Sequence, residues 1–423
     1  MRNLATCEII SVGTELLLGD ILNTDAQFLS QELAKMGISV VYQTTVGDNP
    51  ERLRKALEAA AERSDIIIAS GGLGPTPDDL TKEICCEFFG RECFLHEESL
   101  ERMKRYFSNK KVEMPESNIK QAMLPEGCTV FVNYNGTAPG CAMEKDGKHI
   151  IMLPGPPREL TAMFRESAVP YLAQFSDKTI ISHEIRTFGI GESALAERVK
   201  NFLEGKNPTV APYAKDGEAL LRVTAMADDK ESAELLMKPV IDSLLSELGD
   251  VVYGTDKPNI ETAVVEMLKE NGLVLATAES CTGGLISQRI TSVAGSSEVF
   301  QCGIVSYANK IKNKILGVSE KDLETYGAVS EQVARQMAQG VLRLSGADAA
   351  VSVTGIAGPG SDGTDKPVGL SYIGFAAKDG TIQVKKLLTG HSGANCRDYN
   401  RYVNASNALN MVRLWIKDKN NKL

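Results

Sequence analysis

The sequence predicts an α/β protein of three domains, and its length and its pattern of apolar residues are the two reasons. The 423 residues correspond to about three domains of common size. Short β-branched runs alternate with amphipathic segments of helical period along most of the chain. Apolar residues at 43% and charged residues at 24% are typical of soluble globular proteins, which excludes disordered, collagen-like and coiled-coil chains.

The first domain, residues 1–172, is expected to contain a parallel sheet with helices on both faces. Apolar runs and helical periodicity predict strands at 7–13, 38–47, 64–72 and 149–153, with helices at 25–37 and 50–61. Short alternation of strand and helix indicates parallel pairing, and such sheets bind ligands at the carboxyl ends of their strands. Glycine-rich turns fall at these ends, at Gly13, at GGLG of 71–74 and at LPGPP of 153–157.

The second domain, residues 173–255, follows the order β-α-β-β-α-β. The predicted elements are a strand at 178–189, a helix at 192–205, a hairpin of 208–217 with 218–227, a helix at 230–249 and a strand at 250–254. This order is typical of a small α+β module in which two helices cover one face of a sheet.

The third domain, residues 256–423, begins with a polar hinge around Pro258 and is a second α/β unit. Its evident strands lie at 272–280, 300–309, 348–358 and 370–378, and its last helix is predicted from about Asp398 to about Lys417.

Charge and cysteine content narrow the class of protein. The formal net charge of −9 without a basic block argues against a protein that holds duplex nucleic acid through phosphates. The nine cysteines are odd in number and form no CxxC pair, so we expect neither a disulfide framework nor a thiolate zinc site, and we expect a cytoplasmic location. No stretch approaches the ~18 apolar residues of a membrane span, and the start lacks the features of a secretory leader.

The clearest chemical signal is AESCTGG at 278–284, where Ser280 directly follows a strand and precedes glycines that open a helix. This geometry would expose the hydroxyl while the N–H groups of Cys281, Thr282 and Gly283 stabilise an oxyanion. Two other interpretations stay open. Ser280 could merely cap the helix, and Cys281 beside it is intrinsically the better nucleophile.

A general base for Ser280 must come from outside a Ser-His-Asp triad. Of the four histidines only His391 lies in this domain. The segment VSYANKIKNK supplies Tyr307, Lys310, Lys312 and Lys314, and a lysine shielded from water has a lowered pKa that suits it to deprotonate serine. The alternative for each lysine is a solvated surface position.

Six segments in this order resemble the CinA C-terminal domain: AESCTGG at 278–284, AGSS at 294–297, FQCGIVSYANKIK at 300–312, GAVSE at 327–331, TGIAGPGS at 354–361 and KPVG at 366–369. That family is associated with hydrolysis of nicotinamide mononucleotide to nicotinate mononucleotide and ammonia. The resemblance implies that Ser280 is the nucleophile and that Tyr307 and Lys312 transfer protons, with Lys310 as a second candidate base. Phosphate-binding candidates are Gly355, Gly358, Lys366, Arg397 and Arg401, the arginines having a solvated helix face as their alternative.

Acidic residues gather in GTELLLGDILNTD at 13–25 and GGLGPTPDDLTKE at 71–83. The carboxylates of Glu15, Asp20, Asp25, Asp78 and Asp79 would lie near strand ends, where oxygen ligands suit Mg²⁺ and a glycine-rich backbone suits phosphate. The alternative for Asp20 and Asp25 is capping of the following helix.

These segments, together with LPGPPRE at 153–159, resemble the molybdopterin-binding domain that also stands at the front of full-length CinA proteins. There it is associated with metal-dependent hydrolysis of ADP-ribose to AMP and ribose 5-phosphate. The resemblance implies a divalent metal, Mg²⁺ or a transition ion, with K⁺ as a further candidate ion. Asp79 is the first catalytic or metal-ligand candidate, followed by Glu15, Asp78 and Asn23. The substrate-binding candidates are Gly71, Gly72, Gly74, Thr76, Lys82 and Arg158, with Tyr213, Lys215 and Arg222 from the hairpin of the second domain.

The second domain carries FGIGES at 188–193, which resembles the GxxG loop of KH nucleic-acid domains. Only Arg186 and Lys200 flank it, so the charge favours a dimer interface or a lid over RNA binding. Taken together, the sequence predicts a cytoplasmic, homodimeric, bifunctional enzyme of pyridine-nucleotide salvage. Its rivals are a non-catalytic nucleotide or pterin sensor and an accessory protein of DNA uptake or repair.

Overall fold

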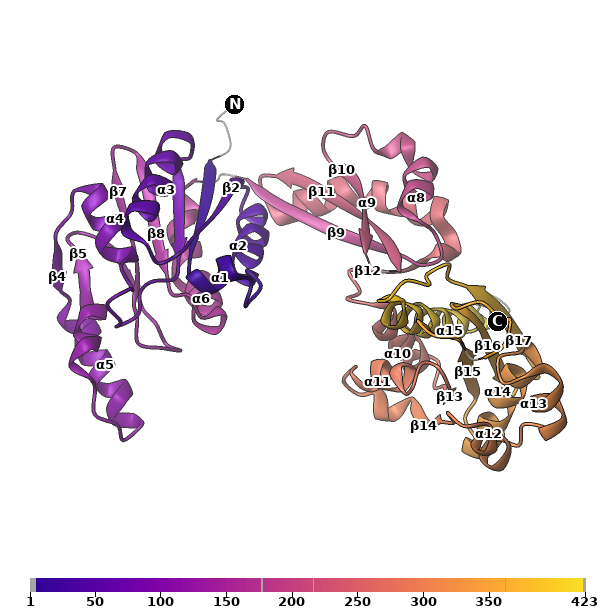
Figure 1. Cartoon of the computed structure of the whole chain (residues 1–423). Helices are drawn as coiled ribbons and strands as arrows, with labels where there is room; N and C mark the ends of the chain where they lie inside the picture. Colours follow the sequence, from indigo (N-terminus) through magenta and orange to yellow (C-terminus); the bar gives the residue numbers. More distant parts are fainter. Residues whose placement is uncertain (1–4, 176–177, 216, 362, 421–423) are drawn as a thin grey trace. The chain divides into compact units, whose positions relative to one another are not determined.

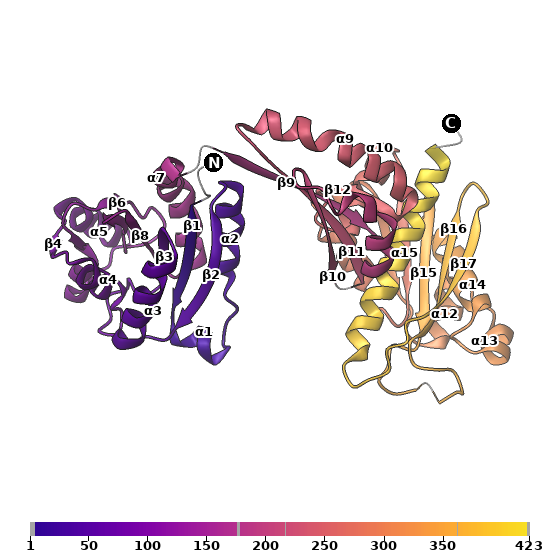
Figure 2. The same ribbon diagram turned by 90° about the horizontal axis from the view of Figure 1, so that it is seen from above.

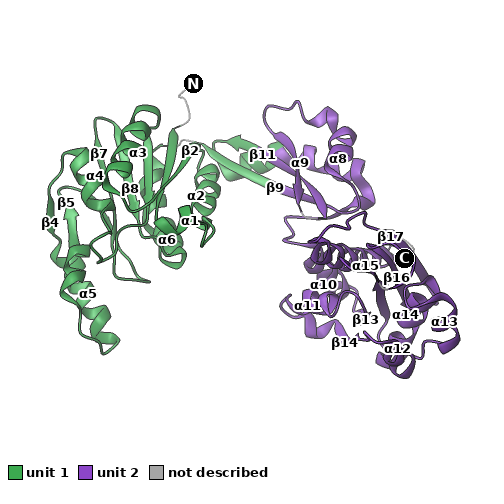
Figure 3. Ribbon diagram, in the orientation of Figure 1, with its two compact units in different colours: residues 1–182, 225–236 green, residues 183–224, 237–423 purple. Residues whose placement is uncertain are grey.

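The computed structural model describes residues 5–175, 178–215, 217–361 and 363–420 (Figure 1). The chain divides into two compact units, Met1–Ser182 with Ala225–Leu236, and His183–Thr224 with Met237–Leu423 (Figure 3). Within the described ranges, no helix combines the length and the apolar character that crossing a membrane requires.

The first unit contains a six-stranded sheet in the order β2-β1-β3-β8-β7-β6. Its strands are β1 (Thr6–Val12), β2 (Ser39–Val46), β3 (Ile66–Ser70), β6 (Thr129–Phe131), β7 (Gly140–Lys145) and β8 (Lys148–Leu153). The first four in the order are parallel, as predicted, whereas β7 and β6 are antiparallel. The fully parallel expectation was wrong at this edge because Asp146 and Gly147, with φ of 53° and 75°, form a tight hairpin turn between β7 and β8.

Helices cover both faces of this sheet, as the sequence predicted. The helices within residues 5–175 are α1 (Thr14–Leu18), α2 (Thr24–Lys35), α3 (Pro50–Arg63), α4 (Thr81–Phe89), α5 (Glu97–Asn109), α6 (Pro157–Met163) and α7 (Val169–Leu172). Of these, α5 packs against Ala122 in a small separate cluster. Alternate residues of β1 enter different cores, since Ile10 packs with α3 and α4 while Ile9 packs with α2 and α6. A separate antiparallel pair consists of β4 (Cys93–Leu95) and β5 (Met123–Pro125). Strand β4 follows α4, and β5 follows the 3₁₀ segment η1 (Glu116–Ala122).

A four-stranded sheet in the order β10-β11-β9-β12 lies in the middle of the chain. Its elements are β9 (Thr179–Thr187), α8 (Glu192–Arg198), β10 (Thr209–Lys215), β11 (Glu218–Ala227), α9 (Lys230–Leu248) and β12 (Val252–Thr255). The predicted order and the β10–β11 hairpin are confirmed. The predicted helix at 192–205 is shorter, because α8 ends at Arg198 and a 3₁₀ turn at Lys200–Phe202 follows.

The C-terminal sheet has five strands in the order β14-β13-β15-β16-β17. These are β13 (Leu275–Glu279), β14 (Phe300–Val305), β15 (Ala349–Gly355), β16 (Leu370–Ala377) and β17 (Ile382–Leu388), the first three parallel and the last two antiparallel. Its helices are α10 (Ile260–Glu270), α11 (Leu285–Thr291), α12 (Asn309–Leu316), α13 (Glu320–Tyr326), α14 (Glu331–Ser345) and α15 (Cys396–Asn420). Helices α10 and α15 pack on one face and α14 on the other, with α15 running along the sheet (Figure 2).

Within the second unit, one buried arginine of α15 makes hydrogen bonds to the last residues of the region that contains the four-stranded sheet. Arg413 of α15 is 3% exposed and donates hydrogen bonds to the carbonyls of Val252 and Asp250 at 2.8 and 2.6 Å. Because a buried guanidinium needs acceptors, these two bonds fix β12 against α15.

Candidate active sites

The C-terminal site forms at the carboxyl ends of the parallel strands β13, β14 and β15. Ser280 directly follows β13, and its N–H donates to the carbonyl of Val353 in β15 at 2.9 Å. On the other side, the N–H of Ser306 donates to the carbonyl of Glu279 at 2.8 Å. Gly283 and Gly284, with φ of 61° and 95°, turn the chain from the strand into α11. Ser280 is thus held at the sheet edge between two strands, as the sequence predicted.

The carboxylate of Glu279 stabilises this turn by hydrogen bonds to the residues that start α11. Glu279 is fully buried, and its carboxylate accepts hydrogen bonds from the N–H groups of Gly284, Ile286 and Ser287 at 2.9–3.0 Å. The Ser287 hydroxyl donates a further bond at 2.7 Å. The carboxylate thereby satisfies the free N–H groups at the start of α11. The sequence analysis missed this residue, although an acidic side chain just before a glycine-opened helix is a usable signal.

Lys312 is the lysine that the structure brings to Ser280. Its Nζ lies 3.0 Å from the Ser280 Oγ, 2.7 Å from the Ser306 carbonyl and 3.0 Å from the Tyr307 carbonyl. Lys310 and Lys314 are exposed, whereas Lys312 is 1% exposed. Burial lowers the pKa of Lys312 to about 8.

The surroundings of Lys312 suit an amine that changes its protonation state. As an ammonium, Lys312 has three N–H donors for the three oxygens around it. As a neutral amine it keeps two N–H donors for the two carbonyls, which leaves its lone pair facing the Ser280 hydroxyl. The arrangement therefore orients a base at the serine.

The predicted oxyanion donors divide into two groups. The Gly283 N–H donates to the Ser280 carbonyl at 3.0 Å, so the expectation that it is a free donor was wrong. The N–H groups of Cys281 and Thr282 have no acceptor in the part of the chain that the structure describes. The Cys281 thiol is buried and its pKa is raised to about 12, mainly by burial, so it is protonated at neutral pH. This favours Ser280 over Cys281 as the nucleophile.

Two arginines from the first turns of α15 reach the same loops. Arg397 donates to the carbonyl of Gly358 at 2.9 Å and to the hydroxyl of the exposed Tyr307 at 3.4 Å. Arg401 donates to the carbonyl of Thr282 through two nitrogens at 3.3 and 3.0 Å. Both arginines therefore lie beside the loops that carry the site.

Two other residues predicted to contact phosphate, Lys366 and Gly355, make close contacts with neighbouring segments of the fold. The Lys366 ammonium donates to the carbonyls of Tyr326 and Val329, both at 2.7 Å, and so ties its loop to the end of α13. A Cβ at Gly355 would lie 2.5 Å from the Cβ of Ser371 in the neighbouring strand. The structure thus gives both residues packing contacts.

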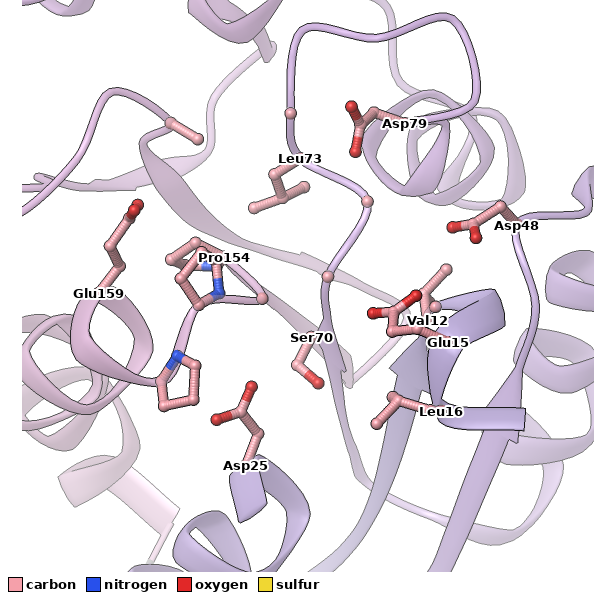
Figure 4. Close-up of a pocket in the computed structure, with 18 of the residues that line it drawn as sticks. Val12, Glu15, Leu16, Asp25, Asp48, Ser70, Leu73, Asp79, Pro154 and Glu159 are labelled. Atoms are coloured by element: carbon pink, nitrogen blue, oxygen red, sulfur yellow. The ribbon is translucent and has the colours of Figure 1, made fainter. Parts of the chain in front are cut away.

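The N-terminal site is a cavity of about 550 Å³ at the carboxyl ends of β1, β3 and β8 (Figure 4). Its lining includes six carboxylates, from Glu15, Asp25, Asp48, Asp78, Asp79 and Glu159. Among the described residues that line it, none is a lysine, arginine or histidine. Figure 4 shows that the labelled carboxylates come from separate elements, with Glu15 on α1, Asp25 on α2 and Glu159 on α6.

The glycines of the 71–74 loop are required by close contacts. Gly71 has a φ of 94°, and a Cβ there would lie 2.2 Å from the Val12 carbonyl oxygen. A Cβ on Gly74 would lie 2.4 Å from the Asp79 carboxylate. Gly71 can therefore approach the backbone of β1 only without a side chain, whereas at Gly74 the Asp79 side chain would have to move. Gly72 also lines the cavity, with a φ of 67°.

Asp79 shapes the loop as well as lining the cavity. Its carboxylate accepts the N–H of Thr76 at 2.9 Å and the Thr76 hydroxyl. Lys120, which the sequence analysis did not single out, donates to the carbonyls of Thr76 and Asp79. Asn23 caps α2 by accepting the N–H of Ala26 at 3.0 Å and also lines the cavity.

Other predicted contacts of this site lie elsewhere. The buried Lys82 donates to the carbonyls of Lys120 and Gln121, both at 3.0 Å, so its ammonium supports η1. Arg158 and Asp20 are exposed and are not among the residues that line the cavity. Tyr213, Lys215 and Arg222 belong to the second unit, and their role at this site stays a prediction.

The oxygen-rich lining fits a hydrated Mg²⁺ ion that a substrate phosphate helps to hold. Among the described residues, no group of three or more His, Cys, Asp or Glu side chains is gathered to hold an ion by itself. Mg²⁺ commonly takes only one or two protein carboxylates and completes its shell with water and phosphate oxygens. Asp25 Oδ1 is buried without a hydrogen-bond partner in the described chain, and burial raises the pKa of Asp25 to about 6. An unpaired carboxylate oxygen of this kind is a fitting neighbour for a cation.

Comparison with known proteins decides the family. A CinA-like protein from Dictyoglomus turgidum is 51% identical over 409 residues, which are 96% of this chain and 98% of the relative. The chain belongs to the CinA family. A second CinA-like protein, from Kosmotoga olearia, is 48% identical over 90% of this chain and 93% of its own length.

Three family models match successive parts of this CinA-family chain. They are described as "Probable molybdopterin binding domain" at residues 8–174, "Damage-inducible protein CinA KH domain" at 182–254 and "CinA C-terminal domain" at 257–416. The family predicted from the motifs is thereby confirmed. A crystal structure of the protein CinA from Thermoplasma acidophilum is 32% identical and covers 40% of this chain and 99% of its own, with a TM-score of 0.38.

Proposed function

We propose that the C-terminal site is a serine-lysine amidohydrolase that converts nicotinamide mononucleotide to nicotinate mononucleotide and ammonia. The observation that carries this proposal is the 3.0 Å contact between the Lys312 amine and the Ser280 hydroxyl, in surroundings that lower the pKa of Lys312 to about 8. A neutral lysine at this distance can take the hydroxyl proton as the serine oxygen attacks.

The reaction follows from the positions of these groups. Lys312 takes the Ser280 proton, and the serine Oγ attacks the carboxamide carbon. The N–H groups of Cys281 and Thr282 stabilise the oxyanion, since they have no acceptor within the described chain. Lys312 then returns its proton to the leaving nitrogen, and ammonia departs. Water, deprotonated by the same amine, hydrolyses the acyl-serine and releases the carboxylate product.

Recognition of the nucleotide phosphate falls to Arg397 and Arg401. Both side chains are held at the site by backbone carbonyls, Gly358 for Arg397 and Thr282 for Arg401. Each guanidinium has five N–H donors, so it retains donors for a phosphate while keeping these contacts.

The deciding experiment measures ammonia release from nicotinamide mononucleotide by the full chain and by Ser280→Ala and Lys312→Met variants at equal folded concentration. Release by the intact chain that both substitutions abolish supports the proposal. Lys310→Ala is the matched control, because Lys310 is exposed on the same helix and should leave the rate unchanged. Absence of release from the intact chain would leave a non-catalytic nucleotide binder.

A second activity, the metal-dependent hydrolysis of ADP-ribose to AMP and ribose 5-phosphate, is proposed for the N-terminal site. The supporting observation is the cavity lining, which has six carboxylates and no cationic side chain among its described residues. A pyrophosphate cannot bind against such a lining unless cations neutralise the charge. Bound divalent metal would neutralise the phosphate oxygens and polarise the scissile bond.

This chain's own residues have separable roles there. Glu15, Asp78 and Asp79 are the candidates from which the metal would take one or two ligands, while the loop of Gly71, Gly72 and Gly74 gives the phosphates close access to backbone. AMP release that requires added Mg²⁺ or a transition ion would support catalysis. Calorimetric binding of ADP-ribose without turnover in any of these metals would instead identify a sensor. We also propose, as the sequence analysis expects, that the protein is cytoplasmic and forms a homodimer.

A further inference from the structure

Cys86 and Cys93 bring their sulfur atoms to within 2.9 Å of each other in the first unit. Cys86 lies in the last turn of α4, and Cys93 is the first residue of β4. Between them the helix ends at Gly90, which has a φ of 64°, and the Arg91 N–H donates to the Cys86 carbonyl at 2.8 Å. This C-terminal helix turn folds the chain back on itself. The local backbone conformation at the end of α4 therefore brings the two cysteines together.

The two thiols differ in exposure and in ionisation. Cys93 is partly exposed, whereas Cys86 is 3% exposed. The hydrogen bond with Cys86 lowers the pKa of Cys93 against the opposing effect of partial burial, and the nearby Lys82 charge on α4 also lowers it. The same hydrogen bond, together with burial, raises the pKa of Cys86. Of the two thiols, the more accessible Cys93 therefore loses its proton the more readily.

We propose that Cys86 and Cys93 form a reversible oxidation site that reacts with hydroperoxides and closes to a disulfide. The Cys93 thiolate attacks a peroxide oxygen and the O–O bond breaks, so that Cys93 becomes a sulfenic acid. The other oxygen takes a proton from solvent and leaves as water or as an alcohol. The Cys86 sulfur then attacks the Cys93 sulfur, and the S–O bond breaks. Hydroxide leaves with the Cys86 proton as water. With hydrogen peroxide, two thiols lose two electrons and the peroxide becomes two waters.

The site is attached to the frame of the N-terminal cavity. Helix α4 begins at Thr81, whose N–H donates to the carbonyl of Gly72 in the cavity loop at 3.2 Å. Lys82 on the same helix holds the carbonyl of Gln121, which lines the cavity. A Cys86–Cys93 disulfide would therefore link the helix that supports this loop to the following strand.

The adjacent Cys85 provides a matched control. It is fully buried, packs in the core with α3 and β1 residues, and burial raises the pKa of its thiol. Cys85 and Cys86 are in the same tryptic peptide, 83–91, while Cys93 is in peptide 92–102. Only the structure distinguishes the two neighbours.

The test exposes the reduced full chain to hydrogen peroxide, blocks the remaining thiols and maps the tryptic peptides by mass spectrometry without reductant. We expect the nine free thiols to fall by two and peptides 83–91 and 92–102 to be joined by a bond that dithiothreitol reverses. The bond should persist in Cys85→Ala and disappear in Cys86→Ala and Cys93→Ala.

Three outcomes would overturn the proposal. They are a bond through Cys85, overoxidation of Cys93 without a bond, and retention of all nine thiols at peroxide levels that oxidise the partly exposed methionines Met36 and Met114. Fragmentation of the linked peptides from the unsubstituted chain locates the bonded sulfur directly, so the result does not depend on the folding of a variant.

Discussion

The C-terminal site buries one lysine beside a serine, whereas six carboxylates line the N-terminal cavity. In the first, removal from water makes the charged form of Lys312 less stable and so produces a base near neutral pH. In the second, like charges repel unless a cation joins them. The comparison teaches that burial of a single ionisable group shifts its pKa toward neutrality, while accumulated like charge creates a demand for cations, and the two proposed activities depend on these two effects.

The sharpest way to separate the two sites is Ser280→Ala. We expect ammonia release from nicotinamide mononucleotide to fall by at least about 10³-fold, because the attacking oxygen is lost. AMP release from ADP-ribose should be unchanged, since the cavity lies in the other unit. Both products are measured on the same preparation. Loss of both activities would contradict the independence of the sites.

Removal of metal should have the converse effect. EDTA should lower AMP release by at least about 10²-fold, since the lining carboxylates would face the pyrophosphate without neutralisation, and added Mg²⁺ should restore it. Ammonia release should not change. Glu15→Gln should weaken the metal dependence, with the exposed Asp20→Asn as its control. Full ADP-ribose turnover in EDTA would rule out the metal-bridged interpretation.

The pH dependence tests whether burial prepares the base. Lys312 must be neutral to accept a proton, and its pKa is lowered to about 8. Below that value, kcat/KM for deamidation should therefore rise about tenfold per pH unit and then level off. Lys310→Ala should show the same profile. A rate independent of pH between about 6 and 9 would exclude Lys312 as the titrating base.

Arg397→Ala tests the smallest of these effects. We expect KM for nicotinamide mononucleotide to rise by about tenfold with a smaller change in kcat, because a charge-assisted phosphate contact is lost while Ser280 and Lys312 stay in place. Steady-state kinetics measure both constants. Arg335→Ala is the control, since this exposed side chain pairs with Glu331 on α14. An unchanged KM would remove Arg397 from phosphate recognition.

Much of the fold could be predicted because local patterns decide it. The predicted apolar runs correspond to β1, β3, β13 and β15, and the position of Ser280 at a strand end followed from the alternation of strands and helices. The antiparallel edge of the first sheet was missed, although the Asp146–Gly147 pair that forms its turn is visible in the sequence.

The identity of the base could not be predicted in this way. Lys310 and Lys312 are two residues apart on one short helix, so they face different directions, and only the packing of α12 shows which one is buried. Lys82 gives the opposite lesson. It stands in a motif next to a loop that the sequence predicts to bind phosphate, but its ammonium donates to the carbonyls of Lys120 and Gln121.

The sequence by itself determined the family, the strand and helix pattern, and the loops at which chemistry is expected, because these depend on residues near one another in the chain. Tertiary structure decided which ionisable groups are buried from solvent, which N–H groups already donate a hydrogen bond and which carboxylates line the same cavity. Those properties depend on partners far along the chain, as with Ser280 and Lys312, whose contact spans 32 residues. Solvation and hydrogen bonding are set by neighbours in space, and they determine what each residue can do.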